Sequence, residues 1–228
     1  MPRISRIIAP GLPHHIAQRG NNLSPVFLSD EDRETYLDML SFNASRHALQ
    51  IWAYCLMENH LHILAVPERP DSLARGIGIT NQVYTQYINR RLHHTGHLWQ
   101  NRFFSCIVGG NQQLWETARY IECNPLRADL AHNAEDYAWS SARAHTSGSK
   151  DPVLSPVSWL PPRKRKAYHT FLRLVDEAAD DAIRRATRTG RPFASDDFID
   201  TLERQMQQPL RPGKPGRPPK KMLEAAPP

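Results

Sequence analysis

An apolar run over residues 51–66 constrains the fold more than any other part of the sequence. It is rich in β-branched and aromatic residues and is closed by a proline, a combination typical of buried strands. Glu58-Asn59 divides the run, so we expect two strands joined by a tight turn. His60 and His62 lie in the second strand. Residues two apart on a strand point to the same face, so the two imidazoles should project side by side, with Leu61 in the opposite layer.

These two histidines form a candidate metal site. Neighbouring imidazoles on a rigid strand are able to bind one cation together, because each neutral ring offers an unprotonated nitrogen. Two ordinary hydrogen-bonded histidines would show the same spacing. The choice depends on which side chains the rest of the chain brings to His60 and His62.

The segments around this hairpin alternate between strand and helix patterns. In chain order we expect a strand over 14–19, a helix from Ser29 or Asp30 to about residue 47, a helix over 71–92, a loop and strand within 98–108, and a helix over 112–123. The hairpin falls between the first two helices. This order predicts an α+β fold of the ferredoxin-like type, with helices covering one face of a small antiparallel sheet.

The chain changes character after residue 151, where four prolines within 152–162 indicate a linker. A helical pattern then runs over 163–188, and a further helix begins at Ser195. The last residues are rich in Pro, Gly and basic side chains, a composition typical of disorder. We therefore predict a main domain over 1–150, a helical extension over 151–208 and a disordered basic tail over 209–228.

The net charge of +6 comes entirely from the C-terminal part. Residues 1–162 carry 14 Lys and Arg against 14 Asp and Glu, whereas residues 163–228 carry 15 against 9. A neutral main domain with a basic extension favours a polyanionic partner, most simply nucleic acid. A solvated tail without a specific partner would have the same composition.

The cysteines and the apolar segments bear on the compartment. Cys55, Cys106 and Cys123 form no CxxC pair, which argues against a disulfide framework or a zinc ribbon. The N-terminal residues lack the apolar segment of a signal peptide, and no uncharged stretch reaches the length of a membrane span. We therefore expect a cytoplasmic protein without a membrane partner.

The predicted helix over 112–123 carries a candidate nucleophile. Tyr120 and Asn124 are four residues apart and lie on one helix face. If that face meets His60 and His62, two imidazoles and one amide oxygen would hold a divalent cation, and the Tyr120 phenol would attack an electrophile beside it. A free phenol has a pKa of about 10, and a nearby cation favours the phenolate.

Other assignments stay open at this point. Tyr120 also fits a half-buried packing residue on an amphipathic helix, and Tyr84 and Tyr87 on the preceding helix are rival nucleophiles. Glu58 and Glu122 are candidate acid–base groups, although each also fits a solvated or helix-surface position.

Four motifs in a fixed order resemble those of a known family. His60-Leu61-His62 resembles the histidine–hydrophobic–histidine motif of HUH single-strand endonucleases. Leu98-Trp99-Gln100-Asn101-Arg102-Phe103, Tyr120-Ile121-Glu122-Cys123-Asn124-Pro125-Leu126-Arg127-Ala128 and Tyr137-Ala138-Trp139-Ser140-Ser141 resemble motifs of the REP-associated tyrosine transposases, relatives of single-tyrosine insertion-sequence transposases. A lone His-x-His is weak, but the four together are specific and span about residues 8–146. One departure is Asp129, where the family pattern has a glycine.

The resemblance implies a ferredoxin-like enzyme that uses Mg²⁺ or Mn²⁺ to cut and rejoin single-stranded DNA near small hairpins. It implies His60 and His62 as metal ligands and Tyr120 as the nucleophile. Asn124 is the implied third ligand, and some relatives have a glutamine at this position. Such an enzyme would be nucleoid-associated, as a monomer or a homodimer.

DNA contacts are expected from basic and aromatic side chains near these motifs. Aromatic rings stack on bases and arginines bind phosphates, although core packing fits the aromatic residues equally well. Residues 214–221 in the tail resemble an AT-hook, whose Gly-Arg-Pro core enters a narrow minor groove; a nonspecific phosphate-binding tail is the alternative. The candidates are Arg19, Asn21, Arg90, Arg91, Trp99, Arg102, Phe103 and Arg217.

Two other functions fit the same fold. A nucleic-acid-binding regulator would leave the site unused, and a metal-dependent hydrolase would activate water and would not need Tyr120. The joint presence of His60, His62, Tyr120 and Asn124 favours the strand-joining enzyme.

Overall fold

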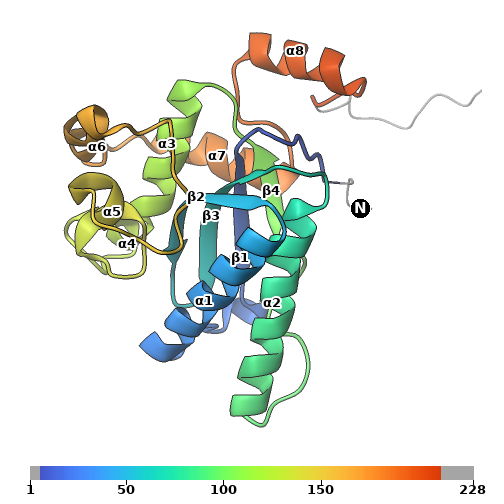
Figure 1. The fold of residues 1–228 in the computed structure, drawn as a ribbon, viewed down its shortest axis with the longest axis vertical. Coiled ribbons are helices and arrows are strands. Elements are labelled where there is room, and N and C mark those ends of the chain that lie inside the picture. The colour runs from blue at the N-terminus through green and yellow to red at the C-terminus, as the bar shows by residue number, and fades with distance from the viewer. Residues whose placement is uncertain (1–5, 212–228) are drawn as a thin grey trace, which may run out of the picture.

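A four-stranded antiparallel sheet forms the centre of the protein (Figure 1). The computed structural model describes residues 6–211, so Arg217 and the predicted AT-hook lie outside the described residues. The strands are β1 (His14–Arg19), β2 (Leu49–Leu56), β3 (His60–Pro67) and β4 (Phe104–Ile107), in the spatial order β2-β3-β1-β4. Together with the chain order β1-α1-β2-β3-α2-β4, this is the ferredoxin-like arrangement that the sequence predicts.

Helices cover both faces of the sheet (Figure 1). Helices α1 (Asp30–Arg46) and α2 (Ser72–Arg91) lie on one face, and α3 (Asn111–Glu122) and α7 (Glu177–Thr189) lie on the other. The sequence predicted one covered face. The second face is covered because it is also apolar: Ala53 and Leu64 of the sheet pack in one cluster with Ala118 of α3 and Ile183 of α7.

Shorter helices surround α3 and the edge of the sheet. Helices α4 (Asn124–Arg127), α5 (Ala142–Ser147) and α6 (Arg165–Phe171) gather beside α3, whereas α8 (Asp196–Met206) packs near the end of β4 (Figure 1). Single 3-10 turns lie at Asn21–Leu23, Ala134–Asp136 and Pro162–Lys164. Within residues 6–211, no helix is both long enough and apolar enough to cross a membrane.

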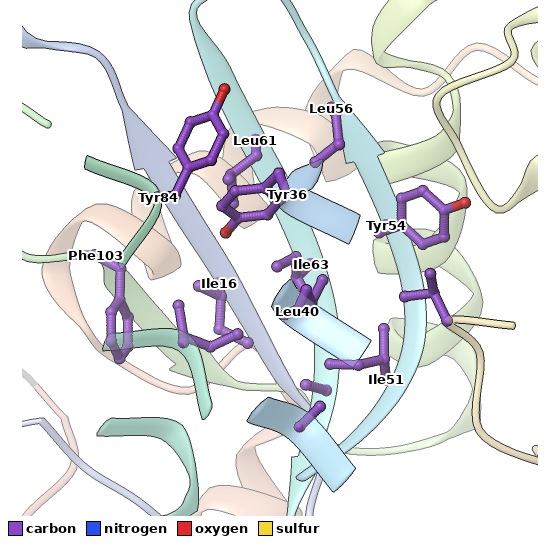
Figure 2. Close-up of a cluster of buried hydrophobic side chains, with 14 of the residues drawn as sticks. Ile16, Tyr36, Leu40, Ile51, Tyr54, Leu56, Leu61, Ile63, Tyr84 and Phe103 are labelled. Carbon is purple, nitrogen blue, oxygen red and sulfur yellow. The ribbon is translucent and has the colours of Figure 1, made fainter. Parts of the chain in front are cut away.

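The larger core lies between the sheet and the pair α1–α2 (Figure 2). Alternate residues of the strands, including Ile16, Leu61 and Ile63, point into it and meet Leu40 of α1 and Tyr84 of α2. All five side chains are fully buried, and each such burial stabilises the fold by about 1.5–3 kcal/mol. The opposite face of the same strands is partly apolar and also carries His15 and His62 toward α3.

Local signals explain where the first helix begins. Ser29 caps α1 by accepting from the Asp32 backbone N–H, and the Asp32 side chain accepts from the Ser29 backbone N–H, which makes a capping box. Asp32 also pairs with Arg91 at the end of α2 over 2.8 Å. One buried carboxylate thus ties the start of α1 to the end of α2.

The C-terminal extension packs against the rest of the protein. The single helix expected over 163–188 is divided into α6 and α7, because Asp176 caps a new helix by accepting from the Ala179 backbone N–H over 3.0 Å. Of the tail predicted from residue 209, the described part includes Leu210, which is fully buried and whose carbonyl accepts from Arg191 over 2.8 Å.

Candidate active site

A pocket of about 530 Å³ opens where β1 ends and β3 begins, between the sheet and helices α3, α4 and α7. Segments from distant parts of the sequence meet there. The polar side chains that line it are His15, Gln18, Arg19, His60, His62, Gln100, Tyr120, Asn124, Arg127, Arg184, Thr187 and Arg188. Among the residues that the structure describes, no Asp or Glu contributes to this lining.

The histidines of β3 project side by side into this pocket, as their spacing predicts. The ring centroids of His60 and His62 are 5.3 Å apart, and Leu61 lies in the opposite core. Strand pairing adds a third imidazole. Because Ala17 of β1 pairs with His62, His15 lies diagonally beside His62 on the same face, with ring centroids 5.0 Å apart.

Hydrogen bonds orient the His60 ring and the Asn124 amide. The Asn59 amide nitrogen donates to the Leu23 carbonyl, so its oxygen accepts from His60 Nδ1 over 2.7 Å and leaves His60 Nε2 unprotonated in the neutral ring. The Asn124 amide nitrogen donates to the Tyr120 and Ile121 carbonyls over 2.9 and 3.2 Å. The Asn124 oxygen is therefore turned away from its own helix.

Burial keeps the imidazoles of the pocket neutral. Burial, and then the charge of Arg19, lower the pKa of His60 to about 4, although a hydrogen bond with Asn124 opposes this shift. Burial alone lowers the pKa of His15 to about 3. Burial, with His15 and His60 nearby, holds the pKa of His62 well below its usual range. Neutral imidazoles are the form that binds metal ions.

Tyr120 of α3 lies beside these histidines in the same chain. Its ring centroid is 5.3 Å from that of His62 and 5.6 Å from that of His15. The guanidinium groups of Arg127 and Arg184 lie 4.5 and 5.7 Å from the ring centroid. Tyr120 is only 5% exposed, yet two imidazoles and two cations border its ring.

Arg184 is linked to the Tyr120 phenol. Burial lowers the pKa of Arg184, but the hydrogen bond with Asp181 and the charge and hydrogen bond of Tyr120 outweigh it, so the pKa is raised. Arg127 is held in place by Asp180 over 3.0 Å and also donates to the Tyr120 carbonyl.

The rival nucleophiles lie on the other face of the sheet. Tyr84 is fully buried in the α1–α2 core, where its hydroxyl donates to the Val26 carbonyl over 2.7 Å, and burial raises its pKa. Tyr87 packs on Tyr84, with ring centroids 5.9 Å apart. Neither ring reaches the histidine pocket.

The two glutamates expected as acid–base candidates do not line the pocket. Glu58 is exposed in the β2–β3 turn. Glu122 is fully buried and accepts from Ser141 over 2.5 Å, His145 over 2.6 Å and Tyr168 over 2.8 Å. We call these four residues the Glu122 cluster. It ties the Tyr-x-Trp-Ser-Ser motif and α6 to α3.

The structure separates the DNA-binding candidates into exposed and buried ones. Arg19, Arg90 and Arg102 are exposed, Asn21 is half-buried, and Arg91 is engaged with Asp32. The expectation that Trp99 and Phe103 stack on bases must be corrected. Trp99 is 9% exposed and donates to the Asn81 carbonyl, and Phe103 is 5% exposed with Arg6 stacked on its ring.

The donor set of the pocket fits a divalent cation. Among residues 6–211, no three His, Cys, Asp or Glu side chains are grouped to hold a metal ion, so the set depends on the Asn124 oxygen. His60 Nε2, a nitrogen of His62 and this oxygen are neutral donors on one pocket wall. Two imidazole nitrogens and one amide oxygen are donors that a divalent cation is able to use while keeping positions open.

Several pocket residues were not foreseen from the sequence. The register of β1 against β3 places His15 in the pocket. Arg127 enters it from the motif that follows Tyr120, and Arg184 and Thr187 enter it because α7 packs there. The expected family glycine is replaced by Asp129, which has a φ of 53° and so keeps the left-handed turn after α4.

Comparisons with known proteins agree with the motifs. The family model described as "Transposase IS200 like" matches residues 11–124, half of the chain. A protein of Haemophilus influenzae named as a REP-associated tyrosine transposase is 25% identical over 99 residues. That alignment covers 39% of this chain and 56% of the Haemophilus protein, so the chain spans just over half the length of this relative.

Two solved structures are similar to this chain. A REP-associated tyrosine transposase bound to a REP hairpin is similar with a TM-score of 0.52 and 14% identity, over 69% of this chain and 93% of that chain. A transposase from Deinococcus radiodurans has a TM-score of 0.37 and 20% identity, over 50% of this chain and 91% of that chain. The first of these likenesses supports the α+β fold.

Proposed function

Because this chain belongs to the IS200-like transposase family, we propose that it cuts and rejoins single-stranded DNA at hairpin-forming repeats through a covalent bond to Tyr120. The observation that supports this most directly is the position of the Tyr120 ring, 5.3 Å from that of His62 within the same chain. The match to a transposase bound to a REP hairpin suggests repeats of that kind as the substrate.

We propose that His60, His62 and Asn124 hold Mg²⁺ or Mn²⁺. A divalent cation bound there would polarise the scissile phosphate and neutralise the charge that grows on it. The neutral imidazoles and the outward amide oxygen support this assignment, because none of them needs to lose a proton first.

Tyr120 would act as the nucleophile. Its oxygen forms a bond to phosphorus, the bond from phosphorus to the 3′ oxygen breaks, and the phenol proton passes to solvent while the leaving oxygen takes one up. The product is a 5′-phosphotyrosine that preserves the energy of the bond for rejoining by another 3′-hydroxyl. Arg184 and Arg127, which border the ring, would stabilise the phenolate and bind the phosphate.

The surface around the pocket suggests how DNA reaches it. Arg19 and Arg188 line the pocket and are exposed, so they are placed to bind phosphates on either side of the cut. Phe104, half-buried in the pocket lining, is the aromatic side chain placed to stack on a base. A cytoplasmic, nucleoid-associated location would accompany this activity.

A labelled hairpin with a single-stranded flank, incubated with the protein and Mn²⁺, tests the proposal. We expect a covalent protein–DNA adduct on a denaturing gel that is absent for Tyr120→Phe. Binding without cleavage in the wild type would instead support a DNA-binding regulator. Cleavage that survives in Tyr120→Phe would support a hydrolase that activates water.

A further inference from the structure

A buried hydrogen-bond chain connects α7 to the histidine pair of β3. Thr187 of α7 lies 2.7 Å from His15 Nδ1, and His15 Nε2 lies 2.9 Å from His62 Nδ1. All three residues are at most 8% exposed. Thr187 lies outside the segment 11–124 that matches the family model, so this chain joins the family core to the C-terminal extension.

The direction of the first hydrogen bond follows from Thr187. Its hydroxyl donates to the Ile183 carbonyl over 2.8 Å, within the same helix. A carbonyl only accepts, and a hydroxyl has one proton, so Thr187 Oγ1 has only acceptor capacity left for its other neighbours, His15 and the Cys106 thiol 3.4 Å away. His15 Nδ1 therefore carries the proton and donates it to Thr187.

The second hydrogen bond then has a fixed direction as well. The hydrogen-bond and ring partners of His15 are Thr187, His62 and Tyr120, none of which has a carboxylate, and its ring is fully buried, so it stays neutral. A neutral imidazole has one proton, so His15 Nε2 is an acceptor. His62 Nδ1 must donate to it, which leaves the lone pair of His62 on Nε2.

We propose that Thr187 and His15 form a positioning relay that fixes the proton of His62 on Nδ1 and so keeps His62 Nε2 open to a divalent cation. The cation site itself rests on the proposed function. Outer hydrogen bonds of this kind set which ring nitrogen binds a metal. Here the outer partner belongs to α7, so the docking of the C-terminal extension would determine whether the β3 histidine is able to bind.

The tautomer of His62 is measurable in the metal-free protein by long-range ¹H–¹⁵N NMR. The wild type and Thr187→Ser, which keeps the hydroxyl, should show His62 protonated on Nδ1. Thr187→Val has almost the same shape but no acceptor, so the His15 proton should move to Nε2 and His62 should become protonated on Nε2. A wild-type His62 protonated on Nε2 would overturn the relay.

Calorimetric titration with Mn²⁺ measures the consequence. We expect Thr187→Val to bind Mn²⁺ about ten- to a hundredfold more weakly than the wild type, and Thr187→Ser to bind almost unchanged. Thr117→Val is the matched control, because Thr117 is equally buried and bonds its own helix over 2.7 Å but does not touch a pocket histidine. His15→Phe removes both ring nitrogens and should reproduce the loss.

The outcomes distinguish a failure of the proposed relay from a failure of the proposed cation site. If the wild type and both Thr187 variants bind Mn²⁺ equally and His62 keeps one tautomer, the relay is wrong and the cation site stands. If the wild type fails to bind Mn²⁺, the proposed cation site is wrong, and the NMR comparison of valine with serine at position 187 still decides the relay.

Discussion

Helix α3 presents a tyrosine and a glutamate, two residues apart, to opposite surroundings. Tyr120 faces a pocket whose lining, within residues 6–211, has neutral imidazoles and exposed arginines but no acidic side chain. Glu122 faces the other way into a sealed cluster, in which Ser141, His145 and Tyr168 all donate to its carboxylate. The same residue types, histidine and tyrosine, thus occur on both sides of one helix.

The two sides differ in whether their polar groups already have hydrogen-bond partners and in the charge beside each tyrosine. Within the Glu122 cluster both carboxylate oxygens are occupied, and burial and the charge of Glu122 raise the pKa of Tyr168 far above its usual range. Around Tyr120, by contrast, the guanidinium groups of Arg127 and Arg184 border the ring. Burial of a tyrosine beside a histidine therefore does not by itself indicate catalysis; the sign of the neighbouring charge separates the two.

The largest contrast is expected when each tyrosine is replaced by phenylalanine. Tyr120→Phe should abolish the covalent adduct while changing the free energy of unfolding by less than about 1 kcal/mol. Tyr168→Phe should keep the adduct but lower the free energy of unfolding by about 1–3 kcal/mol, because a buried carboxylate oxygen loses its donor. Denaturing gels and urea unfolding measure the two effects. An adduct lost in a stably folded Tyr168→Phe would erase the distinction between the two sides.

His14, which lies outside both regions, shows how burial of a neutral imidazole makes the stability of the protein depend on pH. Burial lowers the pKa of His14 to about 4, against hydrogen bonds that raise it. As the pH falls, the unfolded chain, with a histidine pKa of about 6.5, binds the proton before the folded chain does. The free energy of unfolding that His14 contributes is therefore complete above about pH 6.5 and is lost toward about pH 4.

From these pKa values, the wild type should lose on the order of 3 kcal/mol more unfolding free energy than His14→Gln between pH 7 and pH 4. Glutamine retains a donor for the Leu12 carbonyl and an acceptor for the Ala9 backbone N–H. Urea unfolding at several pH values measures the difference, and parallel pH profiles for the two proteins would contradict it.

Much of this arrangement was predictable, because it depends on local pattern. The hairpin and its paired histidines follow from alternation around Glu58-Asn59, and the start of α1 follows from the Ser29 cap. The ferredoxin-like order follows from these elements in sequence. Tyr120 and Asn124 were placed on one helix face by their spacing, and the structure brings that face to the histidines.

The remainder depends on contacts that no local pattern contains. His15 enters the pocket only because Ala17 pairs with His62, a register set by the whole sheet. Arg184 and Thr187 enter because a helix more than 50 residues after Tyr120 docks on the second face of the sheet. The error at Trp99 has the same origin, since an aromatic side chain beside a basic one fits both a core and a DNA-binding surface.

Arg184 provides a test of the charge on the Tyr120 side. Arg184→Ala should slow adduct formation by about ten- to a hundredfold, because a cation that stabilises the phenolate and the phosphate is removed. Arg185→Ala is the matched control: it removes an exposed arginine from the adjacent position of α7, which does not line the pocket. Single-turnover rates on the hairpin substrate measure both. Equal rates for the two variants would show that net charge, not placement beside Tyr120, is what matters.

The smallest effect is expected from changing the charge on the other side of the helix. Glu122→Gln turns one of the carboxylate oxygens into a donor. The amide nitrogen would face Tyr168, whose hydroxyl is able to turn and accept, while the retained oxygen still accepts from Ser141 and His145.

The cluster then loses its charge-assisted hydrogen bonds, but each of its polar side chains keeps at least one hydrogen bond, so the free energy of unfolding should fall by only about 1–2 kcal/mol. Glu116→Gln, on the same helix and partly exposed, should change it by less than about 0.5 kcal/mol. Adduct formation should stay at the wild-type rate in both. A slower rate in Glu122→Gln alone, at unchanged stability, would mean that the sealed side of α3 also positions Tyr120.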